Sequence, residues 1–257
     1  MEYLVIGFVA AFASLLTFFS GFGLGTILTP AFMLFFPIEV AIALTGIVHL
    51  LNNLFKIGLV GLKANWNVVL RFGGTAVIGA FGGAWLLLHF STTEPLLTYS
   101  LWSYEFEVYT IKLLVAALMA FFAIFELVPA LKKMQFDKNK LLLGGAISGF
   151  FGGLSGHQGA LRSAFLIRYG LSKEVFIATG IIIASFIDIT RLGLYFSRME
   201  GINIEENLAI LITAVLSAFL GAFFGRKLLK KVTLAFVQWT VAVMILMLSL
   251  LLAMGII

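Results

Sequence analysis

Long apolar segments separated by short polar loops make up most of the chain. Five segments carry no Asp, Glu, Lys or Arg, and they span residues 3–38, 72–93, 141–161, 207–224 and 232–257. A helix needs about 20 apolar residues to cross the hydrocarbon core of a bilayer. The pattern therefore predicts membrane helices, in apolar units at 3–36, 38–62, 67–90, 108–128, 141–169, 173–197, 207–225 and 232–256.

The composition also indicates a lipid environment. Of the 257 residues, 61% are hydrophobic and 11% are charged, whereas soluble domains are closer to about one half and about one quarter. The chain has no cysteine, so neither a disulfide framework nor a thiolate metal site is expected. We expect no metal and no cofactor. Glu2 and no basic residue precede the first apolar unit, unlike a secretory signal, so this unit is expected to stay in the mature protein.

Glycine-rich breaks interrupt the first and fifth units, as SGFGLGT at 20–26 and SGHQG at 155–159. These breaks reveal an internal repeat with an offset of 135 residues. Matched positions include Ser20-Gly21 with Ser155-Gly156, Glu39 with Glu174, Asn53 with Asp188, and Lys56 with Arg191. Their shared order predicts two homologous halves, 1–128 and 141–257, joined by a basic linker at 129–140.

Loop charge predicts how the halves sit in the membrane. The basic loops near 63–71, 132–140, 168–173 and 226–231 should face the cytoplasm, and the acidic loops 91–107 and 197–206 should face outside. If every unit crossed once, one basic loop would be misplaced. If the first and fifth units are instead hairpins that enter the membrane and return to the same side, every basic loop lies inside and every acidic loop lies outside. The predicted fold is an all-α integral membrane protein with two inverted-topology repeats, each a re-entrant broken-helix hairpin plus three transmembrane helices, a design common in secondary transporters.

The two breaks resemble those of a known family. The segment SGFGLGTILTP at 20–30 is similar to the glycine-rich S-G-x-G-G-G segment, followed by a proline, of the sulfite exporter TauE/SafE family. The second copy, SGHQGALRSAF at 155–165, has fewer glycines and carries His157, Gln158 and Arg162. The resemblance implies a multi-pass permease of a bacterial or archaeal plasma membrane that carries sulfite, a sulfonate or a related small organic acid.

Four ionisable residues, Lys56, Arg162, Asp188 and Arg191, fall inside apolar units. On insertion scales each costs about 2.5–3.5 kcal/mol at the bilayer centre, so each needs a partner or a wet pathway. Asp188 and Arg191 are three residues apart and share a helix face, which predicts an internal ion pair or an arginine that holds an anion. Lys56 either extends toward the cytoplasm, pairs with Asp188 or contacts the substrate.

The remaining candidates lie near these charges. Arg162 follows the second break by one turn, close to helix N–H groups that attract anions, or else it faces the cytoplasm. His49, Asn52 and Lys56 form one polar stripe on a helix. His157 either binds substrate, carries a proton or caps the broken helix. The expected anion site contains Ser20, Gly21, Gly23, Gly25, His49, Asn52, Asn53, Lys56, Ser155, Gly156, His157, Gln158, Gly159, Arg162 and Arg191, with Asp188 and His157 as the proton-coupling residues.

The predicted function is secondary transport of a small anion by alternating access, and not an enzymatic activity. No nucleotide-binding GxxxxGK[ST] loop is present, so ion or substrate gradients should drive it. The expected partners are a small anion, protons as the coupling ion and the bilayer, and not nucleic acid, because the basic residues fit membrane orientation. Two alternatives stay open. One is a passive anion channel, and the other is a rhomboid-like serine protease in which GLSG at 153–156 supplies Ser155 and His49 is the base.

Small residues recur at matching places in the two halves, as Gly79 and Gly83 in GAFGG and as Gly221 and Gly225 in GAFFG. Such pairs allow close approach of membrane helices. They predict packing either inside the protomer or between the protomers of a homodimer.

We expect both termini outside and the linker at 132–140 inside, because only this arrangement agrees with every loop charge. The measurement is labelling of single introduced cysteines with a membrane-impermeant maleimide in a chain that has no cysteine of its own. A cysteine at position 135 should react only after the membrane is opened. Labelling of that position from outside would contradict the inverted arrangement.

Overall fold

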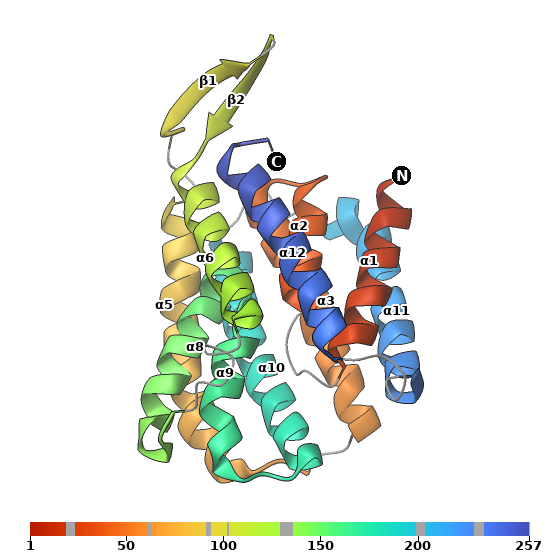
Figure 1. Cartoon of the computed structure of the whole chain (residues 1–257), viewed down its shortest axis with the longest axis vertical. Helices are drawn as coiled ribbons and strands as arrows, with labels where there is room; N and C mark the ends of the chain where they lie inside the picture. The colour runs from red at the N-terminus through yellow and green to blue at the C-terminus, as the bar shows by residue number, and fades with distance from the viewer. Residues whose placement is uncertain are drawn as a thin grey trace.

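The computed structural model describes residues 1–18, 24–60, 63–90, 94–101, 103–128, 136–198, 204–228 and 234–256. These residues form a helical bundle with a small β-hairpin at one end (Figure 1). The first half contains α1 (Glu2–Thr17), α2 (Leu24–Met33), α3 (Ile38–Val60), α4 (Trp66–Val68), the π-helical turn η1 (Val69–Gly73), α5 (Gly74–Phe90), β1 (Leu97–Leu101), β2 (Tyr104–Val108) and α6 (Thr110–Leu127). The second half contains η2 (Lys138–Lys140), α8 (Leu141–Ser155), α9 (Gly159–Leu166), η3 (Ile167–Tyr169), α10 (Lys173–Arg198), α11 (Ile204–Leu228) and α12 (Leu234–Ala253).

The helices have the length and polarity of membrane helices. In the described part of the chain, four are long and apolar enough to cross a bilayer, at Ile38–Leu59, Trp66–Phe90, Lys173–Ser197 and Glu205–Gly225. α1, α2, α6 and part of α12 are apolar but shorter. Large apolar side chains such as Ile78, Phe81 and Trp85 of α5 remain exposed, which suits contact with lipid. These helices are consistent with the predicted helical membrane protein.

The acidic segment between α5 and α6 contains a β-hairpin that the sequence interpretation did not anticipate. β1 pairs antiparallel with β2, with Tyr99 opposite Phe106. Their rings stack with centroids 5.3 Å apart, a cross-strand pair that stabilises so short a sheet. The Tyr99 hydroxyl donates to the Met254 carbonyl oxygen at 2.6 Å, so the hairpin is tied to the chain just beyond α12. Figure 1 shows the hairpin and both chain termini at the same end of the bundle.

A glycine sets the break between α8 and α9. Gly156 has a φ of +81°, a left-handed conformation that costs glycine little because it has no Cβ. Its N–H donates to the Gly152 carbonyl oxygen at 3.0 Å, which caps α8, and the chain restarts as α9 at Gly159. A Cβ on Gly25, in the first turn of α2, would lie 3.6 Å from the Gly156 carbonyl oxygen. The start of α2 therefore meets the second break.

Helices of the two halves pack against one another in matching pairs. α5 packs on α8, and α1 packs on α11. α3 packs on α10, and α6 packs on α12. Each pair joins one helix from each half, so the two halves are interleaved. Figure 1 shows α3 and α10 inside the bundle, with α1, α11, α5 and α8 around them.

The repeated glycines make two of these contacts close. A Cβ on Gly79 or Gly83 would overlap the α8 backbone at Ala146 and Phe150, and a Cβ on Gly221 would overlap the α1 backbone at Ala11. A Cβ on Gly225 would lie 2.8 Å from the Leu15 carbonyl oxygen. Ala11 and Leu15 stand 135 residues before Ala146 and Phe150, which equals the offset predicted for the repeat. These small-residue pairs therefore serve packing inside the protomer.

Replacing Gly83 by alanine should weaken the α5–α8 contact, because the new methyl group would overlap the Phe150 carbonyl oxygen. Overpacking of this kind typically costs about 1–3 kcal/mol. The matched control is Gly82→Ala on the same helix, where the nearest atom to the new Cβ is Phe150 Cδ2 at 3.9 Å. The midpoint temperature of thermal unfolding of the detergent-solubilised protein should fall for Gly83→Ala and stay unchanged or rise for Gly82→Ala. Equal shifts for both variants would contradict the packing described.

Candidate functional site

The charged residues predicted inside the membrane are buried together near the centre of the bundle. Lys56 lies on α3, Arg162 on α9, and Asp188 and Arg191 on α10. In the described part of the chain, the buried side chains with a formal charge are therefore three cations and one carboxylate. Three of the four lie on the central α3–α10 pair, and the fourth lies one turn beyond the second break.

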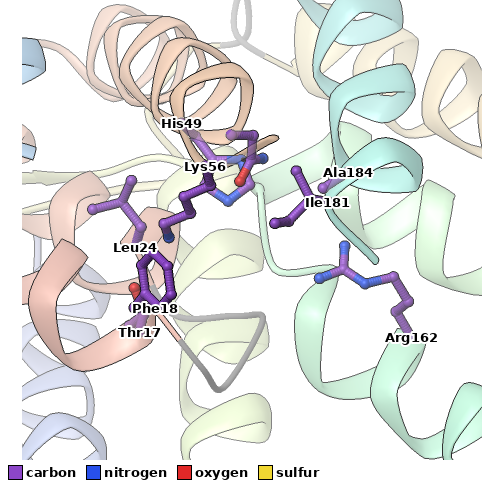
Figure 2. A pocket seen from close by; sticks show the side chains of 9 residues that line it. Thr17, Phe18, Leu24, His49, Lys56, Arg162, Ile181 and Ala184 are labelled. Atoms are coloured by element: carbon purple, nitrogen blue, oxygen red, sulfur yellow. Dashed lines mark hydrogen bonds between the residues drawn. The ribbon is translucent and has the colours of Figure 1, made fainter. Parts of the chain in front are cut away.

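A small cavity lies between these elements. Figure 2 shows Lys56 of α3 and Arg162 of α9 lining it from different sides. Phe18 follows α1, and its ring centroid is 5.7 Å from Lys56 Nζ, so the ammonium group lies over an aromatic face. The cavity is lined by Thr17, Phe18, Leu24, His49, Asn53, Lys56, Arg162, Ile181 and Ala184.

Lys56 is held by its own helix and does not reach Asp188. With the Asn52 amide oriented so that its nitrogen donates to the Ala218 carbonyl oxygen at 3.3 Å, its oxygen accepts from Lys56 Nζ at 3.2 Å. Asn52 is one turn before Lys56, so two residues of the predicted polar stripe on α3 contact each other. The Lys56 side chain is buried, and it therefore does not extend to the cytoplasmic surface.

Asp188 has both carboxylate oxygens bound. Oδ1 accepts from Arg191 Nε at 3.0 Å and lies 2.9 Å from Arg191 Nη2. Oδ2 lies 2.6 Å from His49 Nδ1 on α3. The i,i+3 ion pair predicted on α10 is confirmed. His49, rather than Lys56, is therefore the α3 residue that contacts Asp188. Asn53 Nδ2 lies 3.3 Å from the same histidine nitrogen.

The second break positions both arginines. Gln158 Oε1 accepts from Arg162 Nη1 at 3.3 Å, and Ser148 Oγ donates to the Gln158 carbonyl oxygen at 2.9 Å. A Cβ on Gly156 would lie 3.0 Å from Arg191 Nη1, so a larger residue there would press on the guanidinium. Gly159 begins α9. The break is thus close both to Arg162, which lines the cavity, and to Arg191, which binds the Asp188 carboxylate.

His157 and Ser155 do not line the cavity. His157 Nδ1 lies 3.0 Å from the Ser155 carbonyl oxygen and 3.1 Å from Ser155 Oγ, and its ring stacks on Phe122 of α6 with centroids 5.7 Å apart. A carbonyl oxygen only accepts, so Nδ1 carries the proton and is no base for Ser155. His49, the base that the protease alternative requires, is bound to Asp188. The geometry offers Ser155 no activating partner among these groups.

The first break is only partly described. Ser20, Gly21 and Gly23 lie outside the described residues. Gly25 lies in the first turn of α2 and faces Gly156. In the part of the chain that the structure covers, no group of three His, Asp or Glu side chains is placed to hold a metal ion.

Five residues that line the cavity were missed by the sequence analysis, namely Thr17, Phe18, Leu24, Ile181 and Ala184. Thr45 extends the α3 stripe of His49 and Lys56 by one more turn and is buried, but it does not line the cavity. Phe18 gave no signal, because it is one of 27 phenylalanines. Buried polar atoms without a hydrogen-bond partner in the described chain occur on α2, at the second break and on the central helices, at Thr29 Oγ1, Thr45 Oγ1, His157 Nε2, Gln158 Nε2 and Arg191 Nη1.

Comparison with known proteins identifies the family of this chain. The chain matches the family described as sulfite exporter TauE/SafE over residues 6–252 of its 257. No curated protein and no solved structure gives a significant match. The family match covers both halves, both breaks and every residue of the cavity. The chain is thus a member of the sulfite exporter TauE/SafE family of membrane transporters.

Proposed function

We propose that this chain is a secondary transporter of a small anion, namely sulfite, a sulfonate or a related small organic acid, in the plasma membrane. One observation carries the proposal. Three buried cations and one buried carboxylate surround the centre of the bundle, so the described site has an excess of positive charge. A bound anion would offset that excess, and the family is one of exporters of an anion.

The cavity offers two different kinds of cation to such an anion. Arg162 presents a planar guanidinium with several N–H donors, which suits the oxygens of a sulfite or sulfonate group. Lys56 presents a point charge from α3, near Phe18. Asn53 and His49 add polar groups to the same wall. An oxyanion between Arg162 and Lys56 would contact elements of both halves of the chain.

Alternating access by two inverted repeats is the proposed mechanism. The repeats are 1–128 and 141–257, joined by the linker 129–140. The helix pairs support these repeats. If the two halves exchange places, α5 corresponds to α11 and α8 to α1, so the α5–α8 pair becomes the α11–α1 pair. The α3–α10 and α6–α12 pairs each map onto themselves. The matching glycine contacts at an offset of 135 residues add to this support. The α1–α2 and α8–α9 pairs would be the re-entrant hairpins, whose breaks meet near Gly25 and Gly156.

The proposed orientation has the chain termini and the β-hairpin outside. The hairpin carries Glu105 and Glu107, which fits the acidic outer loop expected from charge. Figure 1 supports this placement, since the hairpin and both termini lie at one end and the connection between α9 and α10 lies at the other. A passive channel would share these features, and counterflow in vesicles separates it from a carrier.

For the protease alternative, Ser155→Ala is the informative change. Ser155 Oγ donates to the Phe151 carbonyl oxygen at 3.2 Å within α8, a bond that alanine can lose at small cost. We expect anion uptake into proteoliposomes to stay within about twofold of the unaltered protein, a loss below about 0.5 kcal/mol. A proteolytic activity that disappears in this variant would overturn the transporter proposal.

Arg162→Gln should weaken equilibrium binding of sulfite and of methanesulfonate by roughly ten- to a hundredfold. A hydrogen bond to a charged group is worth about 1.5–3 kcal/mol, and each 1.4 kcal/mol is about tenfold in affinity. Arg162→Lys should recover part of the loss, because the charge remains while the planar fork is lost. The measurement uses purified protein that elutes as a single species in size-exclusion chromatography.

The matched control for Arg162 is Arg168→Gln. Arg168 lies on η3, two turns further along, and is exposed. This variant removes the same charge from the same segment and should bind both anions as the unaltered protein does. Unchanged affinity in Arg162→Gln, or an equal loss in Arg168→Gln, would remove Arg162 from the anion site.

A further inference from the structure

Asp188 is the carboxylate among the buried charges of the described chain, and its environment is closed. Its side chain is 0% exposed, and it does not line the cavity. Oδ1 is occupied by Arg191 and Oδ2 by His49. A proton that neutralises Asp188 must therefore arrive through one of these two partners. Arginine does not release a proton in proteins, which leaves His49.

His49 connects Asp188 with the cavity. Its side chain is 11% exposed, and it lines the cavity together with Lys56 and Arg162. Its Nδ1 lies 2.6 Å from Asp188 Oδ2, a distance suited to proton transfer along a charge-assisted hydrogen bond. Imidazole accepts a proton on one nitrogen while it releases one from the other, so it can pass a proton without holding a charge.

We infer that His49 relays a proton between the cavity and Asp188, and that this proton moves together with the transported anion. The inference rests on the proposed function. A proton from cavity water binds His49 Nε2, and the Nδ1 proton passes to Asp188 Oδ2. His49 ends neutral with the proton on Nε2, and Asp188 ends as a neutral acid. One proton has entered the site, and the return path releases it to the same cavity.

Neutral Asp188 frees the charge of Arg191 for an anion. In the structure, Arg191 Nε and Nη2 bind Asp188 Oδ1, while Nη1 faces Gly156 and has no hydrogen-bond partner. Once Asp188 is protonated, the arginine loses its counter-charge, and a buried guanidinium then favours an anion near the break. The proton thus adds one positive charge to the site for each anion that it accompanies.

The charges around the pair couple anion binding to the protonation of Asp188. The charged side chains buried near the His49–Asp188 pair are Lys56 on α3, Arg162 on α9 and Arg191 on α10. In the described residues of the other helices packed on α3 and α10, no buried Asp, Glu, Lys or Arg faces the pair. All three neighbours are cations, so they oppose a further proton until an anion offsets them. Anion binding therefore promotes protonation, and protonation promotes anion binding.

His157 provides the contrast within the same chain. It is more buried than His49, its Nδ1 faces the Ser155 carbonyl oxygen and its ring packs on Phe122. No carboxylate is bound to it in the described structure. The coupling role that the sequence suggested for His157 therefore goes to His49 in this proposal, with Asp188 kept as its partner.

The test is the number of protons that cross with each anion in proteoliposomes. The probes are methanesulfonate, which carries no titratable proton, and sulfite in alkaline buffer, where it is a dianion. Anion uptake and internal pH are followed in the same vesicles. The unaltered protein should move about one proton per methanesulfonate, because one Asp188 takes up one proton. His49→Gln and Asp188→Asn should lower this ratio at least tenfold, and His157→Gln should leave the ratio unchanged.

The ratio separates a coupling role from a structural one, because a merely destabilised protein moves fewer anions and fewer protons together. Proton uptake on addition of methanesulfonate to unbuffered, detergent-solubilised protein gives the same readout for a variant that binds without transporting. A wild-type ratio in His49→Gln, or its loss in His157→Gln, overturns the relay. Net uptake of anions without any proton movement in the unaltered protein also overturns it and leaves the proposed function standing. Absence of counterflow for both probes contradicts the proposed function, and the relay with it.

Discussion

The centre of this bundle depends on one buried carboxylate. Asp188 accepts from Arg191 on its own helix and binds His49 on α3, so it joins the two central helices, which belong to different halves of the chain. Without it, Arg191 would be buried with no acceptor, a state that costs several kcal/mol. The carboxylate offsets one cation and leaves Lys56 and Arg162 beside the cavity. Positive charge therefore remains beside the cavity, where we propose that the anion binds.

Close helix contacts make such a polar centre tolerable in lipid. Backbone that leaves the helical form at membrane depth must be covered by protein or must line a wet cavity. Glycines bring α5 onto α8 and α1 onto α11, so each broken helix pair is backed by a tightly packed helix of the other half. The same backing holds Gly156 beside Arg191 and Gly25 beside Gly156. Packing of small residues and placement of charge are thus parts of one arrangement.

Much of the fold could be predicted from the sequence because its signals are local. Apolar length marks the helices, and the glycine at 156 marks the break between α8 and α9. The i,i+3 spacing of Asp188 and Arg191 puts both on one helix face, and the structure confirms their ion pair. The polar stripe of Asn52 and Lys56 likewise follows from helical spacing. These features need no knowledge of which helices are neighbours.

The rest of the site depends on contacts between segments far apart in the chain. His49 and Asp188 are separated by 139 residues, so nothing local pairs them rather than Lys56 and Asp188. The backbone conformation at the break determines that Arg162 faces the cavity while His157 faces Phe122. Such a conformation cannot be predicted from the residue types alone. The β-hairpin was missed because its alternation is short and lies within an acidic loop.

The most direct test of the central claim is counterflow of a radiolabelled small anion into proteoliposomes that contain the purified chain. Vesicles preloaded with unlabelled sulfite or methanesulfonate should accumulate the labelled anion transiently above its equilibrium level, because a carrier exchanges one bound anion for another. A neutral solute of similar size should show no such accumulation. Entry of the label that only approaches equilibrium, with no overshoot, would identify a channel, and no protein-dependent entry of any small anion would contradict the account.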